Sequence, residues 1–242
     1  MSSGQEPTPP SLFGLVQNWE KLLFMHWEVP AERLRALIPP QLSVDTFRGR
    51  AFVSITPFRL TGFRETYVPA IPGFSDFYEI NCRTYVTLGG EHGVWFFSLD
   101  ASRLFAVLGA RIGYSLPYYH ADIEMEESAG AIRYRMKRIS EPAGRGYFRA
   151  TYKPTGDFLD SSPGTLGHFL TERYVLYAAT SGFDAVYRAR VHHAPGELQA
   201  AMADDFATDL FDLAGVGVVE AGPVLHYWER KEVQADLPER CA

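Results

Sequence analysis

The sequence predicts an α+β fold that consists mainly of antiparallel β-strands, in a closed or half-open β-barrel with a few helices packed outside. First, segments rich in β-branched and aromatic residues recur along the chain between turn residues. Second, helical patterns are few, and the connections are too short for a series of βαβ units. Third, hydrophobic residues make up 46% of the 242 residues and aromatic residues 14%, which supplies a sizeable core for one large domain.

About ten strands are expected. Each candidate combines β-branched or aromatic residues with flanking Gly, Pro, Asn, Asp or Ser. The segment at 94–99 is apolar throughout, which is typical of a central strand. The expected strands cover residues 22–29, 51–58, 77–88, 94–99, 118–125, 131–138, 147–152, 173–179, 186–193 and 224–233.

Four helices are expected between these strands. The first lies between Pro30 and Pro39, which suit a helix start and stop. The second follows Asp100, whose carboxylate suits an N-cap; a catalytic carboxylate is the alternative. The last is favoured by apolar residues spaced four apart. The expected helices cover residues 31–38, 101–108, 162–170 and 197–213.

Composition narrows the domain organisation and the partners. Residues 1–11 are rich in proline and read as a flexible lead, and residues 12–242 as a single domain. The net charge of -6 argues against nucleic acid and anionic membranes as partners. The two cysteines form no disulfide framework, and no targeting or membrane-spanning segment is apparent, so we expect a cytoplasmic protein. The expected partner is a small-molecule ligand or substrate, and homo-oligomer formation stays open.

The predicted strand 77–88 carries polar side chains on one face only. Alternation sends Glu79, Asn81 and Arg83 to one side of the sheet, and Ile80 and Cys82 to the other. Glu79 and Arg83 lie roughly 13 Å apart along the strand, so Asn81 or a ligand could lie between them. Two interpretations stay open: this face is the water-exposed outside of the sheet, or it lines a polar interior.

Polar and aromatic residues are densest in a segment that begins at Arg111 and includes Tyr114. Pro117 ends any preceding helix and leads into a strand on which Tyr118 and His120 share one face. A tyrosine hydroxyl or an imidazole in an enclosed site can donate or accept a proton. Packing in the core, with the hydroxyls bonded to backbone, is the alternative interpretation.

Motifs for metals and nucleotide cofactors are missing from the sequence. No two histidines have the i, i+4 spacing of a helical zinc pair, and His192 and His193 point to opposite faces of their strand. The glycine-rich phosphate loops and the Gly-x-Ser-x-Gly elbow of serine hydrolases do not occur either. We therefore expect no metal and no cofactor.

Six motifs, in order along the chain, carry a resemblance to a known family. Together they resemble the YqjF-like DUF2071 family, which is grouped with the acetoacetate decarboxylase-like superfamily. The resemblance covers the chain from about Leu12 to the C-terminus, and it implies a β-barrel or cone-shaped sheet around an interior cavity. The motifs are Leu22-Leu23-Phe24-Met25-His26-Trp27, Glu79-Ile80-Asn81-Cys82-Arg83-Thr84-Tyr85-Val86, Trp95-Phe96-Phe97-Ser98-Leu99-Asp100-Ala101, Leu116-Pro117-Tyr118-Tyr119, Phe169-Leu170-Thr171-Glu172-Arg173-Tyr174 and His192-His193-Ala194-Pro195.

The resemblance also implies the loss of a catalytic lysine. Arg111, Pro117 and Ala121 have the spacing of an acetoacetate decarboxylase motif, and Tyr118 stands where the Schiff-base lysine would be. Glu79 resembles the decarboxylase's active-site glutamate. The motif that begins at His192-His193 departs from the family pattern by losing a Trp and a Pro.

The remaining lysines do not suggest a replacement for this amine. The chain has four lysines: Lys137, Lys153 and Lys231 lie among charged or loop-like neighbours, and only Lys21, before the first expected strand, could reach a cavity. An amine forms a Schiff base at neutral pH only if burial or a nearby cation lowers its pKa. We therefore expect no imine catalysis.

Three functional hypotheses follow. The first is an enzyme of lyase or isomerase type, acting on a small carboxylate or carbonyl compound without a Schiff-base lysine. The second is a non-catalytic module that binds or senses a small molecule. The third is a structural role for the polar cluster. For the enzyme, the candidate catalytic residues are Glu79, Tyr118 and His120, and the candidate substrate-binding residues are Asn81, Arg83, Arg111 and Tyr114.

Overall fold

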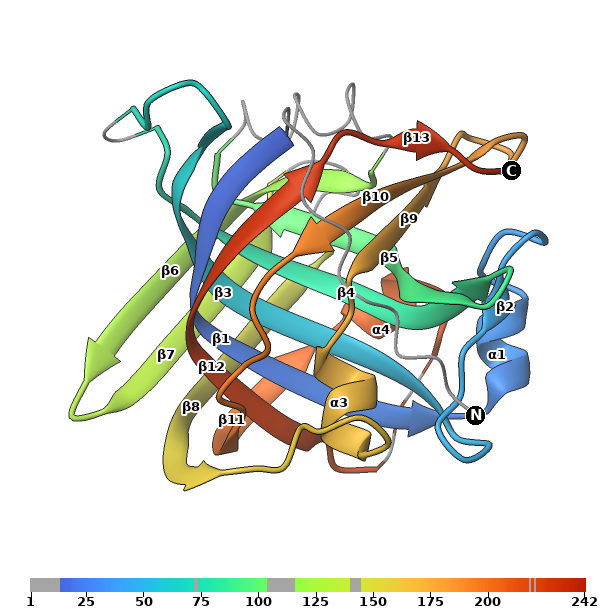
Figure 1. Cartoon of the computed structure of the whole chain (residues 1–242). Helices are drawn as coiled ribbons and strands as arrows, with labels where there is room; N and C mark the ends of the chain where they lie inside the picture. The colour runs from blue at the N-terminus through green and yellow to red at the C-terminus, as the bar shows by residue number, and fades with distance from the viewer. Residues whose placement is uncertain (1–13, 72–73, 104–115, 140–144, 218, 220) are drawn as a thin grey trace.

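The computed structural model describes residues 14–71, 74–103, 116–139, 145–217, 219 and 221–242. Within these ranges, thirteen strands belong to a single sheet, and the helices are short (Figure 1). The helices are α1 (Ala31–Arg35), α3 (Leu166–Thr171) and α4 (Leu210–Leu213). The strands are β1 (Gly14–Val29), β2 (Ser43–Val44), β3 (Ala51–Glu65), β4 (Phe77–Leu88), β5 (Glu91–Ala101), β6 (Tyr118–Ser128), β7 (Ala131–Arg138), β8 (Tyr147–Phe158), β9 (Val175–Ala179), β10 (Val186–His192), β11 (Gln199–Thr208), β12 (Val224–Asp236) and β13 (Glu239–Arg240).

The sheet branches, and it closes in a ring. Strand β5 pairs with β4, β6 and β9, and strand β12 pairs with β1, β10 and β11. One closed path, the first ring, runs β5-β9-β10-β12-β1-β3-β4, and a second ring runs β5-β6-β7-β8-β11-β12-β1-β3-β4 (Figure 1). Strands β12, β1, β3, β4 and β5 therefore form a shared wall between the two rings. The pairings of β5 with β6 and β9 are parallel and the other pairings are antiparallel, so the sheet is mixed and mainly antiparallel, as predicted.

Alternation gives the two faces of the shared wall different neighbours. Ile80 and Cys82 pack in one cluster with Tyr134 and other apolar side chains of β6, β7 and β8. Tyr85, on the opposite face of β4, packs with Leu170 of α3 and with apolar residues of β9 and β10. The second ring thus encloses a mainly apolar core, and the polar face of β4 looks into the first ring.

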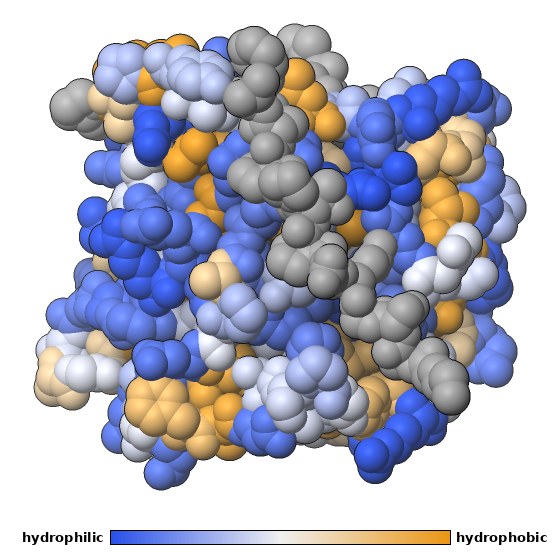
Figure 2. All heavy atoms as spheres, viewed as in Figure 1, coloured by the Kyte–Doolittle hydropathy of each residue, from blue (hydrophilic) through white to orange (hydrophobic). Residues whose placement is uncertain are grey.

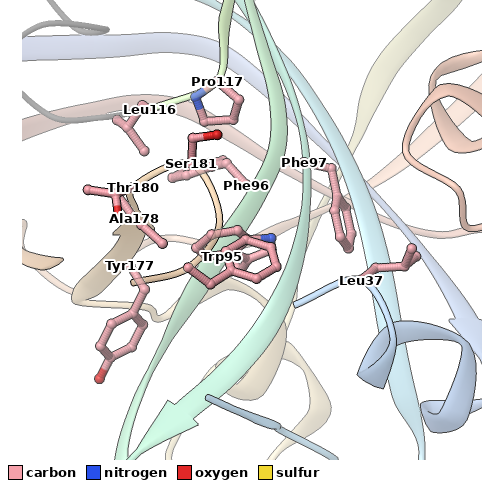
Figure 3. Close-up of a pocket in the computed structure, with 12 residues that line it drawn as sticks. Leu37, Trp95, Phe96, Phe97, Leu116, Pro117, Tyr177, Ala178, Thr180 and Ser181 are labelled. Atoms are coloured by element: carbon pink, nitrogen blue, oxygen red, sulfur yellow. The ribbon is translucent and has the colours of Figure 1, made fainter. Parts of the chain in front are cut away.

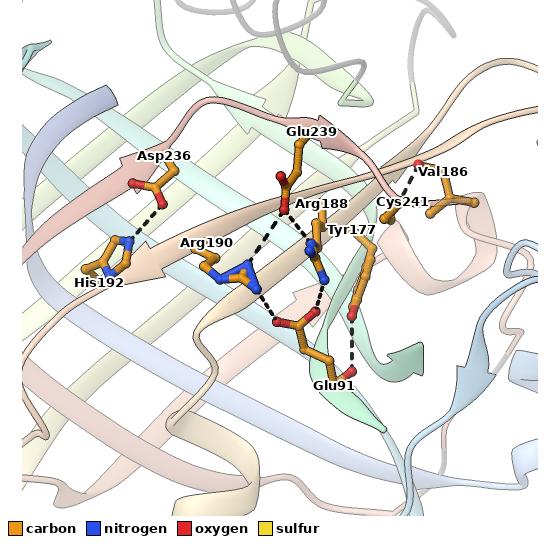
Figure 4. A network of polar contacts seen from close by, with 9 residues as sticks. All are labelled: Glu91, Tyr177, Val186, Arg188, Arg190, His192, Asp236, Glu239 and Cys241. Atoms are coloured by element: carbon orange, nitrogen blue, oxygen red, sulfur yellow. Dashed lines mark hydrogen bonds and ion pairs between the residues drawn. The ribbon is translucent and has the colours of Figure 1, made fainter. Parts of the chain in front are cut away.

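A network of ion pairs fastens the chain's end to the first ring (Figure 4). Glu91 of β5 accepts from Arg188 at 2.6 Å and pairs with Arg190 of β10 at 3.0 Å. Arg188 also donates to Glu239 of β13 at 2.7 Å. Because Arg188 and Glu239 are 30% and 58% exposed, their pair contributes little alone, whereas Glu91 is buried and its two pairs fix the position of β10 against β5.

Most predicted strands are confirmed, and β4 and β7 have the predicted bounds. The predicted helix over 197–213 is wrong, because β11 and the short α4 occupy this segment. Apolar residues spaced four apart fit a strand as well as a helix, because four is also a multiple of the two-residue strand period. Pairing of β11 with β8 and β12 supplies the backbone hydrogen bonds that decide for the strand.

Asp100 is not a helix cap. Asp100 lies within β5. Its carboxylate accepts two hydrogen bonds from the Arg138 guanidinium of β7, at 2.6 and 2.8 Å. The expected helix at 101–108 begins inside β5 at Ala101, and most of it lies outside the described residues. The predicted capping role therefore gives way to a buried ion pair that links two strands of the second ring.

Gly93 occupies a position in β5 where no side chain fits. A Cβ there would lie 2.7 Å from the Val175 carbonyl oxygen and 2.7 Å from the Tyr177 ring. We expect Gly93→Ala to lower the free energy of unfolding by about 1–3 kcal/mol, because the clash with backbone forces β5 and β9 apart. Urea denaturation checks this, with Gly222→Ala as control, since nothing lies within 4 Å of its added Cβ. Equal stability of the two variants would contradict the close packing of Gly93 against β9.

The outer surface carries mainly hydrophilic side chains in the view of Figure 2, with apolar ones in separate groups. Among the described residues, no helix is long and apolar enough to cross a membrane. The polar side chains of Glu79, Asn81 and Arg83 are buried, on the face of β4 that looks into the first ring.

Candidate functional site

The candidate site lies on the face of the shared wall that looks into the first ring. Register places Arg83 of β4 beside Ser54 of β3, and Ser54 beside His26 of β1. Asn81 and Glu79 follow along β4, opposite residues of β3. Glu79, Asn81 and Arg83 are 4%, 5% and 8% exposed, which excludes the interpretation of a water-exposed outer face.

Glu79 is held from both sides of the wall. Its Oε2 accepts a hydrogen bond from the Tyr118 hydroxyl at 2.9 Å. Its backbone carbonyl accepts from the Tyr134 hydroxyl of the second ring at 2.8 Å. Burial raises the pKa of Glu79 to about 8; the Tyr118 hydrogen bond opposes this rise and the charge of Asp100 adds to it. Glu79 is therefore mostly protonated at neutral pH, and it can act as an acid or, after losing its proton, as a base.

Arg83 is a buried guanidinium with unused hydrogen-bond donors. Its Nε and Nη2 atoms have no hydrogen-bond partner among the described residues. Its Cζ atom lies 5.4 Å from the centre of the Phe24 ring, a cation–π contact. Burial lowers the pKa of Arg83, while Tyr85 opposes this shift. A guanidinium in such surroundings is well suited to bind a carboxylate through two parallel hydrogen bonds.

Two buried histidines, His26 and His226, extend this polar face onto β1 and β12. His26 Nδ1 lies 2.9 Å from the Tyr85 hydroxyl, and the two imidazole rings have centres 5.3 Å apart. His26 Nε2 and His226 Nδ1 have no hydrogen-bond partner among the described residues. Burial lowers the pKa of both rings, that of His226 to about 4, and the charges of His226 and Arg83 add to the effect on His26. Both imidazoles are therefore neutral at physiological pH.

These histidines were not among the candidate residues from the sequence. The pairing register that aligns His26 with Ser54 and Arg83 is a property of three separate strands. The available signal was the motif Leu22-Leu23-Phe24-Met25-His26-Trp27, in which alternation places Phe24 and His26 on one face.

The other candidate residues have different outcomes. Tyr118 bonds to Glu79 as described, and Asn81 accepts a hydrogen bond at Oδ1 from the Thr56 hydroxyl. His120 is half-buried and lies level with Ala101, whose other neighbour in the sheet is Glu79. The candidate residues Arg111 and Tyr114 lie outside the described residues.

The lysine that lies buried is Lys231 and not Lys21, so the prediction for these two lysines is wrong. Lys21 has a φ of 55° and pairs with Glu229 at 2.6 Å and Glu127 at 3.2 Å, which raises its pKa. Lys231 is the buried lysine, at 8% exposure, and it donates to the Ala194 carbonyl at 2.8 Å. Burial lowers its pKa, against the opposing charges of Glu172 and Glu197.

The two adjacent histidines of the altered loop point in different directions. The His193 side chain is 1% exposed, stacks on Tyr174 at 4.6 Å and contacts Trp228 of the first ring's interior. His192 pairs with Asp236 at 3.0 Å (Figure 4). Gly196 allows this loop to pack closely against Trp228, because a Cβ added at Gly196 would lie 2.5 Å from Trp228 Nε1. His193 is therefore the histidine of this loop that faces inward.

A pocket of about 300 Å³ opens between β5, β9 and the start of β6 (Figure 3). Mainly apolar and aromatic side chains line it, including Trp95, Phe97, Pro117 and Tyr177. Neither this pocket nor a second one beside α1 is lined by Glu79, Asn81 or Arg83. The hollow expected beside those residues stays a prediction.

The fold is that of acetoacetate decarboxylase-like proteins. The acetoacetate decarboxylase of Legionella pneumophila superposes with a TM-score of 0.68, at 13% identity, over 99% of this chain and 93% of that one. The enduracididine biosynthesis enzyme MppR, solved in complex with pyruvate, gives 0.64 at 12% identity, over 98% and 92%. At these identities the likeness shows the fold alone.

The family follows from the sequence match. Residues 16–232 match the DUF2071 family, described as an uncharacterized conserved protein, and the chain belongs to this family. It is 40% identical over 225 residues to the protein YqjF of Bacillus subtilis (strain 168), covering 93% of this chain and 91% of that protein. The resemblance drawn from the six motifs is confirmed.

Proposed function

We propose that this protein is an enzyme that binds a small carboxylate or carbonyl compound inside the first ring and catalyses proton transfer on it, without a Schiff-base lysine. The observation that carries the proposal is Arg83, a buried guanidinium with two unpartnered donor nitrogens, Nε and Nη2, on the same face as Glu79. A buried donor without a partner is costly, and a carboxylate ligand would satisfy both donors at once.

The chemistry is divided between the two ends of the β4 polar face. Arg83 anchors the carboxylate, and the Thr56 hydrogen bond turns Asn81 so that its amide N–H groups are left to contact the substrate. The carboxylate form of Glu79 removes a proton from the carbon next to the substrate carbonyl, and the resulting carboxyl group returns that proton to the enolate-like oxygen or to carbon, so that Glu79 is regenerated. Tyr118 fixes the carboxyl group of Glu79. The amine of the buried Lys231 donates to the Ala194 carbonyl and has no part in this chemistry, because the proton moves between substrate and carboxyl group and no covalent bond to the protein forms.

A ligand screen followed by product analysis tests the proposal. Small carboxylates and carbonyl compounds are screened by thermal shift, and each stabilising compound is incubated with the protein and analysed by mass spectrometry. We expect Arg83→Met to weaken carboxylate binding about 10-fold or more. We expect Glu79→Gln to retain binding while turnover falls about 100-fold or more.

The control is Arg230→Met, because this arginine side chain is 55% exposed and lies outside the site. Turnover that survives both Glu79→Gln and Arg83→Met would overturn the assignment of these residues. Binding of carboxylates without any product would make the protein a non-catalytic binding or sensing module instead.

A further inference from the structure

Three side chains form a row across neighbouring strands on the face that looks into the first ring. His26, Ser54 and Arg83 are aligned by the registers of β1 with β3 and of β3 with β4. Adjacent strands are about 4.8 Å apart, so the two ends of the row are separated by about 10 Å at the backbone. His26 and Ser54 are 0% exposed and Arg83 is 8% exposed. Each carries a polar atom without a hydrogen-bond partner among the described residues: His26 Nε2, Ser54 Oγ, and Nε and Nη2 of Arg83.

The hydrogen bonds of Tyr85 settle which nitrogen of His26 carries the proton. The Tyr85 hydroxyl donates to the Leu170 carbonyl at 3.0 Å, and a carbonyl can only accept. The hydroxyl has one proton, so in its contact with His26 Nδ1 at 2.9 Å it accepts. A neutral His26 therefore has its proton on Nδ1 and a bare lone pair on Nε2.

The two ends of the row therefore require different hydrogen-bond partners. Arg83 offers N–H donors and needs acceptor oxygens, whereas His26 Nε2 is an acceptor and needs a donor. Ser54 Oγ lies between them and can do either. We propose that this row binds a small hydroxycarboxylate, with the carboxylate on the Arg83 guanidinium and the hydroxyl donating to His26 Nε2. This inference rests on the proposed function, because it names the substrate class of the same site.

A keto acid or an unsubstituted acid fits the row less well. A keto oxygen has no proton, so it would place its lone pairs against that of His26 Nε2, and an unsubstituted acid would leave Nε2 unpaired. Burial, His226 and Arg83 all lower the pKa of His26, so the ring does not become a donor near neutral pH. A site that hydrogen-bonds a substrate hydroxyl discriminates strongly against analogues without it.

Calorimetric titration of the full-length protein with matched acids tests the inference. The probes are lactate, pyruvate and propionate, and the four-carbon set 3-hydroxybutyrate, acetoacetate and butyrate. In at least one set we expect the hydroxy acid to bind about 10-fold or more tightly than its two analogues. Equal binding within both sets, or preference for the keto acids, would overturn this inference and leave the proposed function intact. If none of the six acids binds, both fail.

Variants separate the two ends of the row. His26→Phe should reduce affinity for the hydroxy acid to that of the unsubstituted acid, while affinity for the latter stays unchanged. Arg83→Met should weaken the binding of all six acids by a similar factor. His168→Phe is the control, because this imidazole bonds to the Ser161 carbonyl away from the row, and it should keep the hydroxy-acid preference. If His26→Phe does not fold, His26→Gln takes its place; persistence of the preference in the folded variant contradicts the inference.

Discussion

Replacing Arg138 by Met should lower the free energy of unfolding by about 3–5 kcal/mol, because it leaves the Asp100 carboxylate buried without its cation. The two side chains are 3% and 0% exposed, and the guanidinium donates to both carboxylate oxygens. Arg138 also lies over the Tyr119 ring at 3.7 Å, a contact that Met retains only in part. Equilibrium denaturation at neutral pH measures the loss.

A second substitution isolates the unpaired charge as the cause. Asp100→Leu combined with Arg138→Met removes both charges, so the double variant should recover much of the stability that the single variant loses. The surface pair of Arg133 and Glu126, with side chains 55% and 67% exposed, provides the contrast: Arg133→Met should cost about 1 kcal/mol or less. If the double variant is no more stable than Arg138→Met, the cost comes from lost packing and not from the buried charge.

Glu79 should make the protein less stable as pH rises from about 4.5 to about 8. Below pH 4.5 this residue is protonated in the folded and unfolded states alike, and it contributes no pH dependence. Between the ordinary pKa of 4.5 and the folded-state pKa of about 8, the unfolded chain has lost the proton that the folded chain keeps, so stability falls as pH increases. Above that window the loss is complete, at about 3–5 kcal/mol.

The neutral isostere provides the comparison. Glu79→Gln keeps an acceptor for the Tyr118 hydroxyl and removes the titration, so its unfolding free energy should change less between pH 5 and pH 9. The variant should therefore gain stability relative to the wild type as pH rises. Denaturation curves for both proteins at several pH values give this difference directly. A difference that is constant across the window would mean that the carboxyl group has an ordinary pKa and faces water.

The local sequence pattern was enough to predict most strands, but it did not predict which strands pair with one another. Strand β4 has the predicted bounds, because its alternation is unbroken up to Gly89 and Gly90, whose φ values of 58° and 87° suit a tight turn. The branching at β5 and β12 depends on contacts such as Val94 with Leu176 and Val191 with Ala235, which join residues far apart in the sequence. Such contacts leave no periodic trace in the sequence.

The candidate site was predictable to a similar extent. Alternation placed Glu79 and Arg83 on one face, and burial decides that this face is interior. Nothing in the sequence indicated that Lys21 has a positive φ, which interrupts the alternation of β1. The Lys21 side chain therefore pairs with carboxylates, while the next residue, Leu22, is buried. His26 was missed as a site residue because its importance depends on the strand register.

The shared wall has a consequence for how the sequence of this fold can change. Positions such as 79, 81 and 83 line one ring, while the intervening Ile80 and Cys82 belong to the hydrophobic core of the other. Positions 79, 81 and 83 can therefore be exchanged for a new specificity while Ile80 and Cys82 continue to stabilise the fold. A combinatorial library restricted to positions 79, 81 and 83 should contain many more folded proteins than one restricted to positions 80 and 82.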